Sequence, residues 1–454
     1  MQRNHRIARC AVPLRGQGYC VARAQKTCPT VGGLPIAIVG FCQGGADNDD
    51  VRFSHNGVLM LTQPSFRTAS PEQLAKALQD ARNYTLALFD CFLSAGLDAP
   101  ARVPYLAVVN PPLWELGHVA WFSEWFVLRE APSSHPAAAR YPSLLSQADN
   151  WFDSNTVVHH TRWQLNLPDA AALKQYGDEV LKRILDKLQY SATTDLYPYR
   201  LALAHEDMHG EAFAYTLQTL GVKAPQQLAA PTAPSCPQTE IHFAGGAFQL
   251  GSRPNAGFVF DNEKWAHEIL VPAFSMHSTL VSHAQYREFV LAGGYQKTPY
   301  WSEAGRAWLM REKRLAPRYW QHNDGQWWCV RLGTLMPLPD NEPVRHVNLH
   351  EAQAYCNWAG RRLPTEAEWE LAAMSGNAEF HWGDLWEWTG TPFAPYPEFS
   401  ADRYLEYSAP WFNTHQVLRG ASFATKLHMR SPHYRNFFMA ERDDIFAGFR
   451  TCAL

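Results

Sequence analysis

The sequence predicts an α+β protein in which a helical first part is followed by a second part of short strands and helices. Two observations carry this prediction. Before residue 221, apolar side chains recur in four stretches at the spacing of an amphipathic helix. Beyond residue 238 the sequence becomes rich in Gly and Trp, with short runs in which apolar and polar residues alternate. A chain of 454 residues is long enough for two or three domains, each with a core of its own.

Residues 1–65 are predicted to lie outside the fold, either as a disordered extension or as an over-extended start. In the second case Met60 would be the working initiator. From Met1 to Ala46 the chain contains no Asp or Glu and shows no amphipathic period. A secretory signal peptide needs a compact apolar segment near the start, and residues 34–41 come late for that. The arginine-rich, acid-poor composition leaves a transit peptide as an alternative.

Residues 66–221 are predicted to form a four-helix bundle. Ser70, Pro71 and Gln73 give the first helix an N-cap, a proline in its first turn and a capping-box glutamine. One long connection, at about 130–170, is compatible with such a bundle. The predicted helices begin at Pro71 and near Pro112, and span about 171–190 and 195–220.

A segment rich in Pro, Ala and Gln, residues 222–238, is predicted to be a linker. The second domain then covers residues 239–454. No internal repeat is found there, and most of it is expected to be loops. The elements predicted in it are strands at 241–243 and 248–250 and helices at 348–358 and 365–373.

The composition excludes several classes of protein. A formal net charge of −3 argues against a general binder of nucleic acid or membrane surfaces. No apolar run approaches the roughly 20 residues that span a bilayer. The nine cysteines are scattered, as expected for reduced thiols of a cytoplasmic protein. The 17 Trp and 18 Tyr suit aromatic-walled pockets as well as cores.

Two histidines on the fourth predicted helix are placed to bind one metal ion. His205 and His209 are one helical turn apart, so their side chains share a face. They fall on the stripe predicted to face the bundle interior, where facing helices build metal sites. His118, on the second predicted helix, could supply a third ligand. Three protein ligands on one side of an ion leave positions open for substrates and O2.

Other interpretations of these histidines stay open. Each could be an ordinary core residue, and three imidazoles suit Zn, Fe, Cu or Ni. His205-Glu206-x-x-His209 also matches the zinc-peptidase motif, in which Glu206 would be the general base. Such a peptidase often takes its third ligand from downstream, whereas the candidate here, His118, lies upstream.

In the first half, the pattern resembles the DinB-like domain of the ergothioneine-type sulfoxide synthases. That family carries His-x3-His-x-Glu on one helix together with an earlier histidine. The matching residues are His205, His209 and Glu211, with His118 inside the segment 114–122.

The second half, over about 240–454, resembles the formylglycine-generating-enzyme-like fold, which is a C-type-lectin-like domain. Formylglycine-generating enzymes need a reactive cysteine pair, but Cys329, Cys356 and Cys452 are isolated from each other in the sequence. That activity is therefore not expected, and a lectin-like binding module remains an alternative. The matching segments are 245–248, 362–370, 385–389, 418–422 and 448–450.

The resemblance implies an oxidoreductase that holds Fe(2+) on the three histidines and uses O2 to join sulfur or selenium to the imidazole of hercynine, the betaine of histidine. It also implies a tyrosine from the second domain as a proton or hydrogen donor. The matching position is Tyr407, with Tyr396 and Tyr404 as further candidates. A phenol, with a pKa of about 10, suits that role.

A trimethylammonium group cannot donate hydrogen bonds, so aromatic faces and nearby carboxylates would hold this part of hercynine. The aromatic candidates are Trp411, Phe437 and Phe438. Asp443 and Asp444 could add negative charge beside them.

Departures from the family pattern point to the chalcogen donor. Met208 replaces a glutamine and Asp444 a tryptophan of the ergothioneine enzymes. The loop 151–163 holds one arginine, Arg162, where a pair would grip γ-glutamylcysteine. The missing second arginine predicts a donor with fewer carboxylates, such as a selenosugar. Together with residues 109–114, this pattern resembles the selenoneine synthases. An ergothioneine-type enzyme that uses γ-glutamylcysteine or cysteine is the alternative.

Overall fold

The computed structural model describes residues 65–190, 195–228 and 237–454. They belong to one of the two units into which the chain divides, Arg52–Leu454. Apart from Ser65, the predicted extension 1–65, with Met60, lies outside the described residues.

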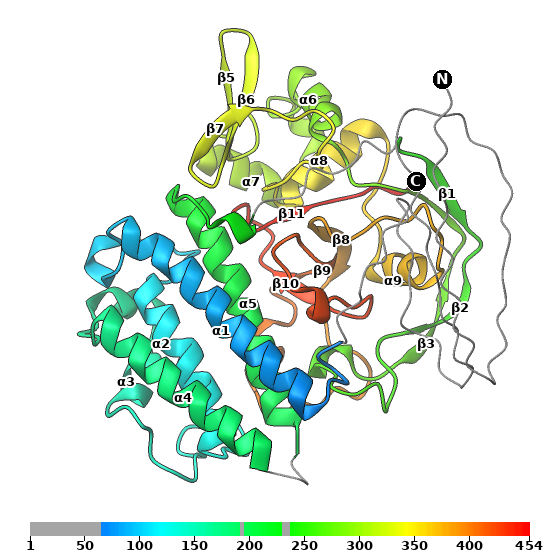
Figure 1. Cartoon of the computed structure of the whole chain (residues 1–454). Coiled ribbons are helices and arrows are strands. Elements are labelled where there is room, and N and C mark those ends of the chain that lie inside the picture. Colours follow the sequence, from blue (N-terminus) through cyan, green and yellow to red (C-terminus); the bar gives the residue numbers. More distant parts are fainter. Residues whose placement is uncertain (1–64, 191–194, 229–236) are drawn as a thin grey trace, which may run out of the picture. The chain divides into compact units, whose positions relative to one another are not determined.

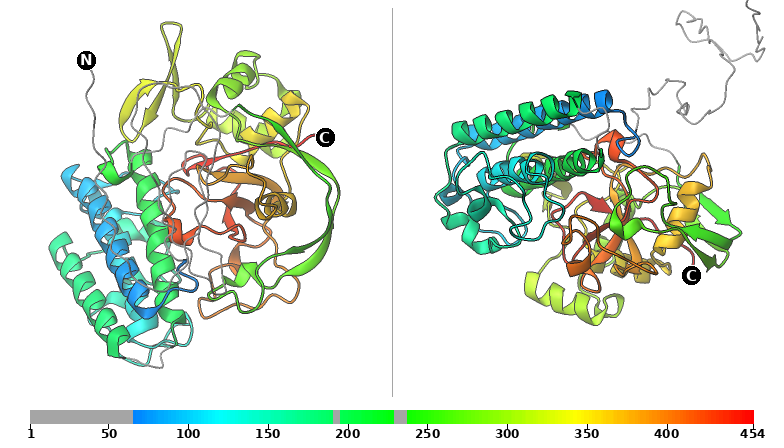
Figure 2. Two further views of the ribbon diagram at one scale, coloured as in Figure 1. Left: turned by 45° about the vertical axis from the view of Figure 1, so that its right-hand side comes forward. Right: turned by 90° about the horizontal axis from the view of Figure 1, so that it is seen from below.

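Four long helices make up most of the helical part, which we define as the described residues between 65 and 228 (Figures 1 and 2). α1 packs against α4 and α5, and α2 packs against the same two helices. The predicted bundle is thus observed. Its helices are α1 (Pro71–Ser94), α2 (Pro112–Ser123), α4 (Ala170–Tyr190) and α5 (Tyr197–Leu220), with the short α3 (Ala148–Phe152) between α2 and α4.

Local sequence signals fix the ends of the two helices that pack most closely. Ser70 and Gln73 form the predicted capping box at the start of α1. α5 ends at Gly221, whose positive φ of 68° is the left-handed C-cap conformation that glycine adopts without strain. α2 runs on into a single π-helical turn, Glu124–Leu128, of the kind often found beside functional sites.

The mixed part, residues 237–454, contains strands in four small sheets. The largest has the order β10-β9-β8-β11, in which β11 is parallel to β8 and the other pairs are antiparallel. The strands are β1 (Glu240–Phe243), β2 (Gly246–Leu250), β3 (His267–Val271), β4 (Phe274–His277), β5 (Trp320–Asn323), β6 (Gln326–Arg331), β7 (Thr334–Pro337), β8 (Trp386–Pro392), β9 (Gln416–Gly420), β10 (Asn436–Phe438) and β11 (Ala447–Gly448).

The mixed part holds more helix than predicted. α8 and α9 lie where helices were expected, whereas α6 and α7 lie in segments that were expected to be loops. α6 begins with a capping box of Ser282 and Gln285, a sequence signal that was overlooked because the helix is short. The helices are α6 (His283–Leu291), α7 (Glu303–Glu312), α8 (Leu349–Ala359) and α9 (Glu366–Met374).

Short 3-10 turns complete the secondary structure. They are η1 (Pro100–Arg102), η3 (His159–Gln164), η4 (Gln226–Leu228), η5 (Asp261–Glu263), η6 (Thr298–Tyr300), η7 (Ala409–Trp411) and η8 (Leu427–Met429). None of the described helices is both long and apolar enough to cross a bilayer.

A continuous hydrophobic core joins the helical and mixed parts. It extends from Phe66, which precedes α1, and Leu74, which lies on α1, to Trp386 on β8 and Phe449 near the end of the chain. Polar contacts also connect the helical part to the mixed part. The carboxylate of Glu211 on α5 accepts hydrogen bonds from Trp386, Ser422 and Thr425 of the mixed part. The junction thus places one face of α5 against the mixed part.

Candidate metal centre

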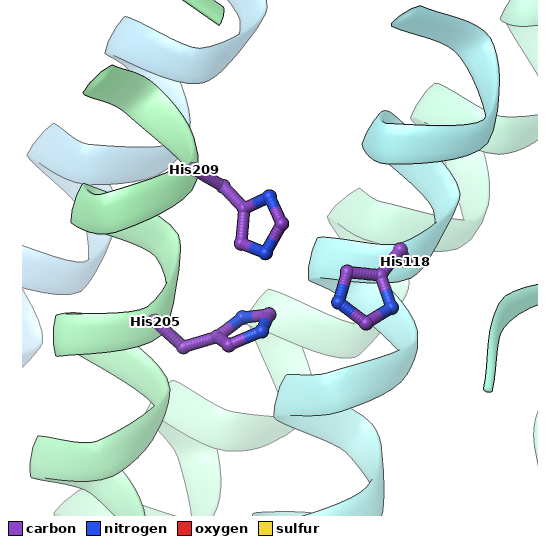
Figure 3. Close-up of side chains that lie close together, drawn as sticks. All are labelled: His118, His205 and His209. Atoms are coloured by element: carbon purple, nitrogen blue, oxygen red, sulfur yellow. The ribbon is translucent and has the colours of Figure 1, made fainter. Parts of the chain in front are cut away.

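Three histidines from two helices converge in the helical part. His118 projects from α2, and His205 and His209 project from successive turns of α5 (Figure 3). One ligand nitrogen from each lies within 4.8 Å of the others. Their ring centroids are 4.4–5.0 Å apart. This spacing suits three ligands of a single ion.

Hydrogen bonds orient two of the three rings. Nδ1 of His118 lies 2.7 Å from the carbonyl oxygen of Phe152, and Nδ1 of His209 lies 2.7 Å from a carboxylate oxygen of Glu115. In both cases a protonated Nδ1 donates, which leaves Nε2 with its lone pair to bind a metal.

His205 is held by packing. Its ring stacks on Phe122, with centroids 3.5 Å apart, and its side chain makes no hydrogen bond within the described residues. Its Nδ1 is buried without a partner. A buried imidazole that lacks hydrogen bonds is costly unless it binds something, so this donor set fits a metal ion.

The surroundings keep two of these candidate ligands, His118 and His205, uncharged. Burial holds the pKa of His118 and that of His205 well below the ordinary histidine value, and the charge of nearby His209 lowers both further. A neutral imidazole is the form that binds a metal ion, because protonation would occupy the lone pair. The two buried rings are therefore ready for a metal at neutral pH.

Glu206 lies between the two α5 histidines in the sequence but binds Arg82 of α1. Nε and Nη2 of Arg82 lie 2.7 and 3.2 Å from the two carboxylate oxygens, and both side chains are buried. A zinc peptidase of the His-Glu-x-x-His type needs this glutamate as a base beside its metal. The ion pair occupies it, which argues against that alternative.

A cavity of about 240 Å³ borders His209. It lies where the helical and mixed parts meet, and both contribute walls. Of the three histidines, His209 is the one among the described residues that lines it. α5 contributes Asp207, Met208 and Glu211, and the mixed part contributes Tyr407, Phe437 and Phe438.

Tyr407, the predicted donor, lies in the cavity wall. Its hydroxyl is 4.0 Å from the sulfur of Met208 and 3.4 Å from the hydroxyl of Tyr434, and its ring stacks on Phe260. Burial, followed by the proximity of Tyr434, raises the pKa of Tyr407 well above that of a free phenol. Its hydroxyl therefore keeps its proton at neutral pH.

The two other tyrosine candidates differ in position. Tyr404 packs edge-on against Phe122, and its ring centroid lies 6.2 Å from that of His205. Tyr396 donates to Glu366 and carries Arg435 over its ring, so its contacts belong to the core of the mixed part. Tyr404 thus remains close to the metal ligands, and Tyr396 does not.

Four of the residues that were predicted to contact the substrate interact with other groups of the protein. Trp411 is 42% exposed and donates to the backbone of Glu406, and it does not line the cavity. Asp443 and Asp444 are neutralised by arginines in ion pairs. The guanidinium of Arg162 lies 3.8 Å from the ring centroid of Trp114, and burial lowers the pKa of this arginine to about 10. The partners of Asp443 and Arg162 lie far away in the sequence, so no local pattern indicates them, whereas those of Trp411 and Asp444 are close along the chain.

Several other residues of the site were not predicted to have a role. Glu115 is three residues before His118 on the same helix face, a spacing that could have indicated its contact with the centre. Glu211 belongs to the quoted motif but was given no function. Lys426 and Tyr434 come from loops without any recognisable pattern, and only the fold brings them to the cavity.

The free cysteines of the mixed part do not form a reactive pair. Cys329, Cys356 and Cys452 are buried thiols, and burial raises the pKa of each. Such thiols are poor nucleophiles, in line with the prediction that formylglycine formation is not the activity.

Three imidazoles beside a cavity that borders one of them define a candidate mononuclear metal centre, as in metal-dependent enzymes. Similarity to known proteins identifies the class of enzyme to which this metal centre belongs. The chain is 31% identical to the hercynine oxygenase of Mycolicibacterium thermoresistibile, over 83% of this chain and 94% of that protein. It is also 31% identical to the hercynine oxygenase of Mycobacterium tuberculosis, over 84% of this chain and 98% of that protein. The chain belongs to the hercynine oxygenase family, and the protein is an oxygen-dependent oxidoreductase.

The mixed part has relatives of its own. A family model described as the sulfatase-modifying factor enzyme 1-like domain matches residues 225–384. The formylglycine-generating enzyme of Streptomyces coelicolor is 31% identical over 36% of this chain and 58% of that protein. Among solved structures, PvdO from Pseudomonas aeruginosa aligns with 48% of this chain and 95% of its own, at a TM-score of 0.33 and 15% identity. The predicted family and fold class are confirmed.

Proposed function

We propose that this protein holds iron(II) on His118, His205 and His209 and joins selenium or sulfur oxidatively to the imidazole of hercynine. The observation that carries this proposal is the three-histidine cluster bordered by an aromatic cavity. Relatives named hercynine oxygenase support the acceptor. Bound iron(II) would supply the activation of O2 that an organic side chain cannot provide.

The cavity fits the acceptor. Six aromatic side chains line it, and a trimethylammonium group gains about 0.5–2 kcal/mol from each aromatic face it contacts. Glu211 adds a buried carboxylate in the same wall. The aromatic lining residues are Tyr215, Trp386, Tyr407, Tyr434, Phe437 and Phe438.

The reaction balances with O2 as the oxidant. The C–H bond of the imidazole and the Se–H or S–H bond of the donor break, and a C–Se or C–S bond forms. When the chalcogen is also oxidised to its oxide, four electrons pass to O2, and its second oxygen atom leaves as water. The hydroxyl of Tyr407 is the group that we assign to deliver a proton to the reacting oxygen, because it is protonated and lines the cavity.

We propose a selenosugar as the donor. Recognition of γ-glutamylcysteine calls for cationic groups that grip two carboxylates. Arg162, the arginine of the loop 151–163, already donates to Asn110 and to the backbone of Val157 while it covers Trp114. This engagement supports a donor that carries hydroxyl groups in place of carboxylates. A thiol donor, γ-glutamylcysteine or cysteine, is the second candidate, since the relatives named hercynine oxygenase support an ergothioneine-type reaction.

The deciding experiment loads the protein with iron(II) without oxygen and adds hercynine with a selenosugar in one sample and γ-glutamylcysteine in another. Air is then admitted, and products are identified by mass spectrometry. We expect a C–Se product in the first sample and little product in the second. A thiol product alone would transfer the assignment to the ergothioneine type, and two intact substrates in both samples would refute the synthase.

A further inference from the structure

The charged side chains of the metal cavity differ in how they are paired. One carboxylate oxygen of Asp207 is 2.6 Å from Nε2 of His428. Both carboxylate oxygens of Glu211 accept hydrogen bonds at 2.6–2.7 Å. In the described part of the chain, Lys426 is the charged group of this wall that forms neither a hydrogen bond nor an ion pair.

Aromatic packing holds the ammonium of Lys426 in place. Its Nζ lies 3.2 Å from the ring centroid of Tyr84, which belongs to α1. The side chain is half-buried and lines both the metal cavity and a neighbouring cavity of about 360 Å³. Asp207 lines the same two cavities. The cation thus stands at the boundary of the metal cavity, where Asp207 and Asp80 act on it electrostatically but no anion among the described residues forms an ion pair with it.

A betaine carries a fixed positive charge and a carboxylate. The aromatic faces and Glu211 are suited to the positive end, but neither carries a positive charge to pair with the carboxylate. His209 is engaged with Glu115 and the metal position. Lys426 is therefore the cationic group of the wall that is left for an anion.

We propose that Lys426 binds the carboxylate of the betaine substrate. This inference rests on the proposed acceptor, hercynine, and assigns the residue that recognises its charged end. Together, the ammonium and the aromatic wall would hold the zwitterion at both ends. The imidazole would then be fixed beside His209, where the metal is proposed to lie.

The test compares two ligands and two forms of the protein. Binding of hercynine and of its decarboxylated analogue, trimethylhistamine, is measured by calorimetry on the iron(II)-loaded enzyme without oxygen or donor. In Lys426→Met the Kd of hercynine should rise about 10-fold or more, the usual loss for a hydrogen bond to a charged group. The Kd of trimethylhistamine should stay within about 2-fold, because it lacks the carboxylate.

Controls separate recognition from folding. Lys426→Arg should restore most of the affinity for hercynine, and Lys426→Gln should behave like Lys426→Met. Lys187→Met removes a half-buried lysine that lines neither cavity and should change neither Kd. Iron content and unfolding midpoints are measured for each variant.

Three results would overturn the proposal. If Lys426→Met and Lys426→Gln weaken both ligands equally, or leave hercynine binding unchanged, Lys426 does not bind the carboxylate, even if the wild-type enzyme forms product. If the wild-type enzyme binds trimethylhistamine and hercynine equally well, the carboxylate is not recognised at all. Absence of hercynine binding and of product in the wild type would instead remove the acceptor and the inference with it.

Discussion

Glu115 determines which nitrogen of His209 carries the proton. The carboxylate accepts from Nδ1 at 2.7 Å and is itself buried, so the ring is fixed with Nε2 toward the other two histidines. A carboxylate behind a ligand histidine also increases the basicity of the ring. The strength of the metal site thus depends on a residue that does not touch the metal position.

Glu115→Gln should lower metal affinity about 10- to 100-fold, the range found when such an outer partner is lost. An amide can still accept the hydrogen bond but removes the negative charge. Competition with a chelator of known affinity at fixed pH measures the change. Glu179→Gln, at an exposed pair with Arg183, is the matched control. Equal metal affinities for wild type and Glu115→Gln would contradict this role.

Tyr407→Phe should reduce the turnover number about 10²-fold, the lower range of general acid–base effects, with little change in the Michaelis constant for hercynine. The change removes the proton donor but keeps the ring that stacks on Phe260. Tyr404→Phe serves for comparison, because Tyr404 is also close to His205 but does not line the cavity. A larger loss in Tyr404→Phe than in Tyr407→Phe would reverse the assignment.

The residues that could be predicted from the sequence are those with a local pattern. His205 and His209 share a helix face by their spacing alone, and the family motif adds His118. Lys426 has no such signal, since its contact with the cavity depends on how a loop of the mixed part packs against α1. Charged contacts of this kind follow from tertiary structure and not from periodicity.

At the scale of the element, α5 has two buried polar faces. One carries the candidate metal ligands, and the other carries Glu206, which is bound to Arg82 of α1. Arg82 also donates to the backbone carbonyl of Gly177 on α4, at 2.6 Å. A single buried ion pair therefore connects three helices of the bundle.

Glu206→Gln should lower the free energy of unfolding by about 3–5 kcal/mol, because it leaves the buried guanidinium of Arg82 without its counter-ion. Urea denaturation followed by circular dichroism measures this loss. Glu179→Gln, which disrupts an exposed pair on α4, should change stability little. If both substitutions have the same small effect, the buried pair does not stabilise the bundle.

The long helices were predictable, whereas only some of the short elements were. α1, α4 and α5 each exceed 20 residues, so their apolar period is unmistakable. α6 and α7 have 9 and 10 residues and no clear apolar period, and β5 and β7 carry exposed side chains at three of their four positions. Their form depends on long-range packing that a local pattern does not contain.

For the whole molecule, the continuous core predicts that the helical and mixed parts unfold together. Circular dichroism of the helices and fluorescence of the tryptophans in the mixed part should give coincident transitions. Iron(II) should raise both midpoints equally, because it binds the folded state. Loss of the helical signal at a lower denaturant concentration than the fluorescence signal would show that the parts are independent.

Stability should also depend on pH through Glu351 at the start of α8. Burial raises the pKa of this carboxyl from 4.5 to about 8. Between these values the folded state keeps a proton that the unfolded state has released, so the free energy of unfolding falls as the pH rises, by at most about 1.4 kcal/mol per pH unit.

Glu351→Gln should flatten this profile, because the amide resembles the protonated acid and can still cap the helix with Asn348. Unfolding midpoints at pH 5, 6, 7 and 8 measure the effect. The variant should gain relative to the wild type as the pH increases. Parallel profiles for the two proteins would show that Glu351 does not titrate in this window.

The candidate metal ligands come from α2 and α5, whereas Tyr407, Phe437 and Lys426 come from the mixed part. The affinity for the metal ion and the choice of substrates can therefore be exchanged separately between related proteins. A chimaera that keeps the bundle of this chain and takes its C-terminal half from a relative would derive its ion affinity from one parent and its choice of substrates chiefly from the other.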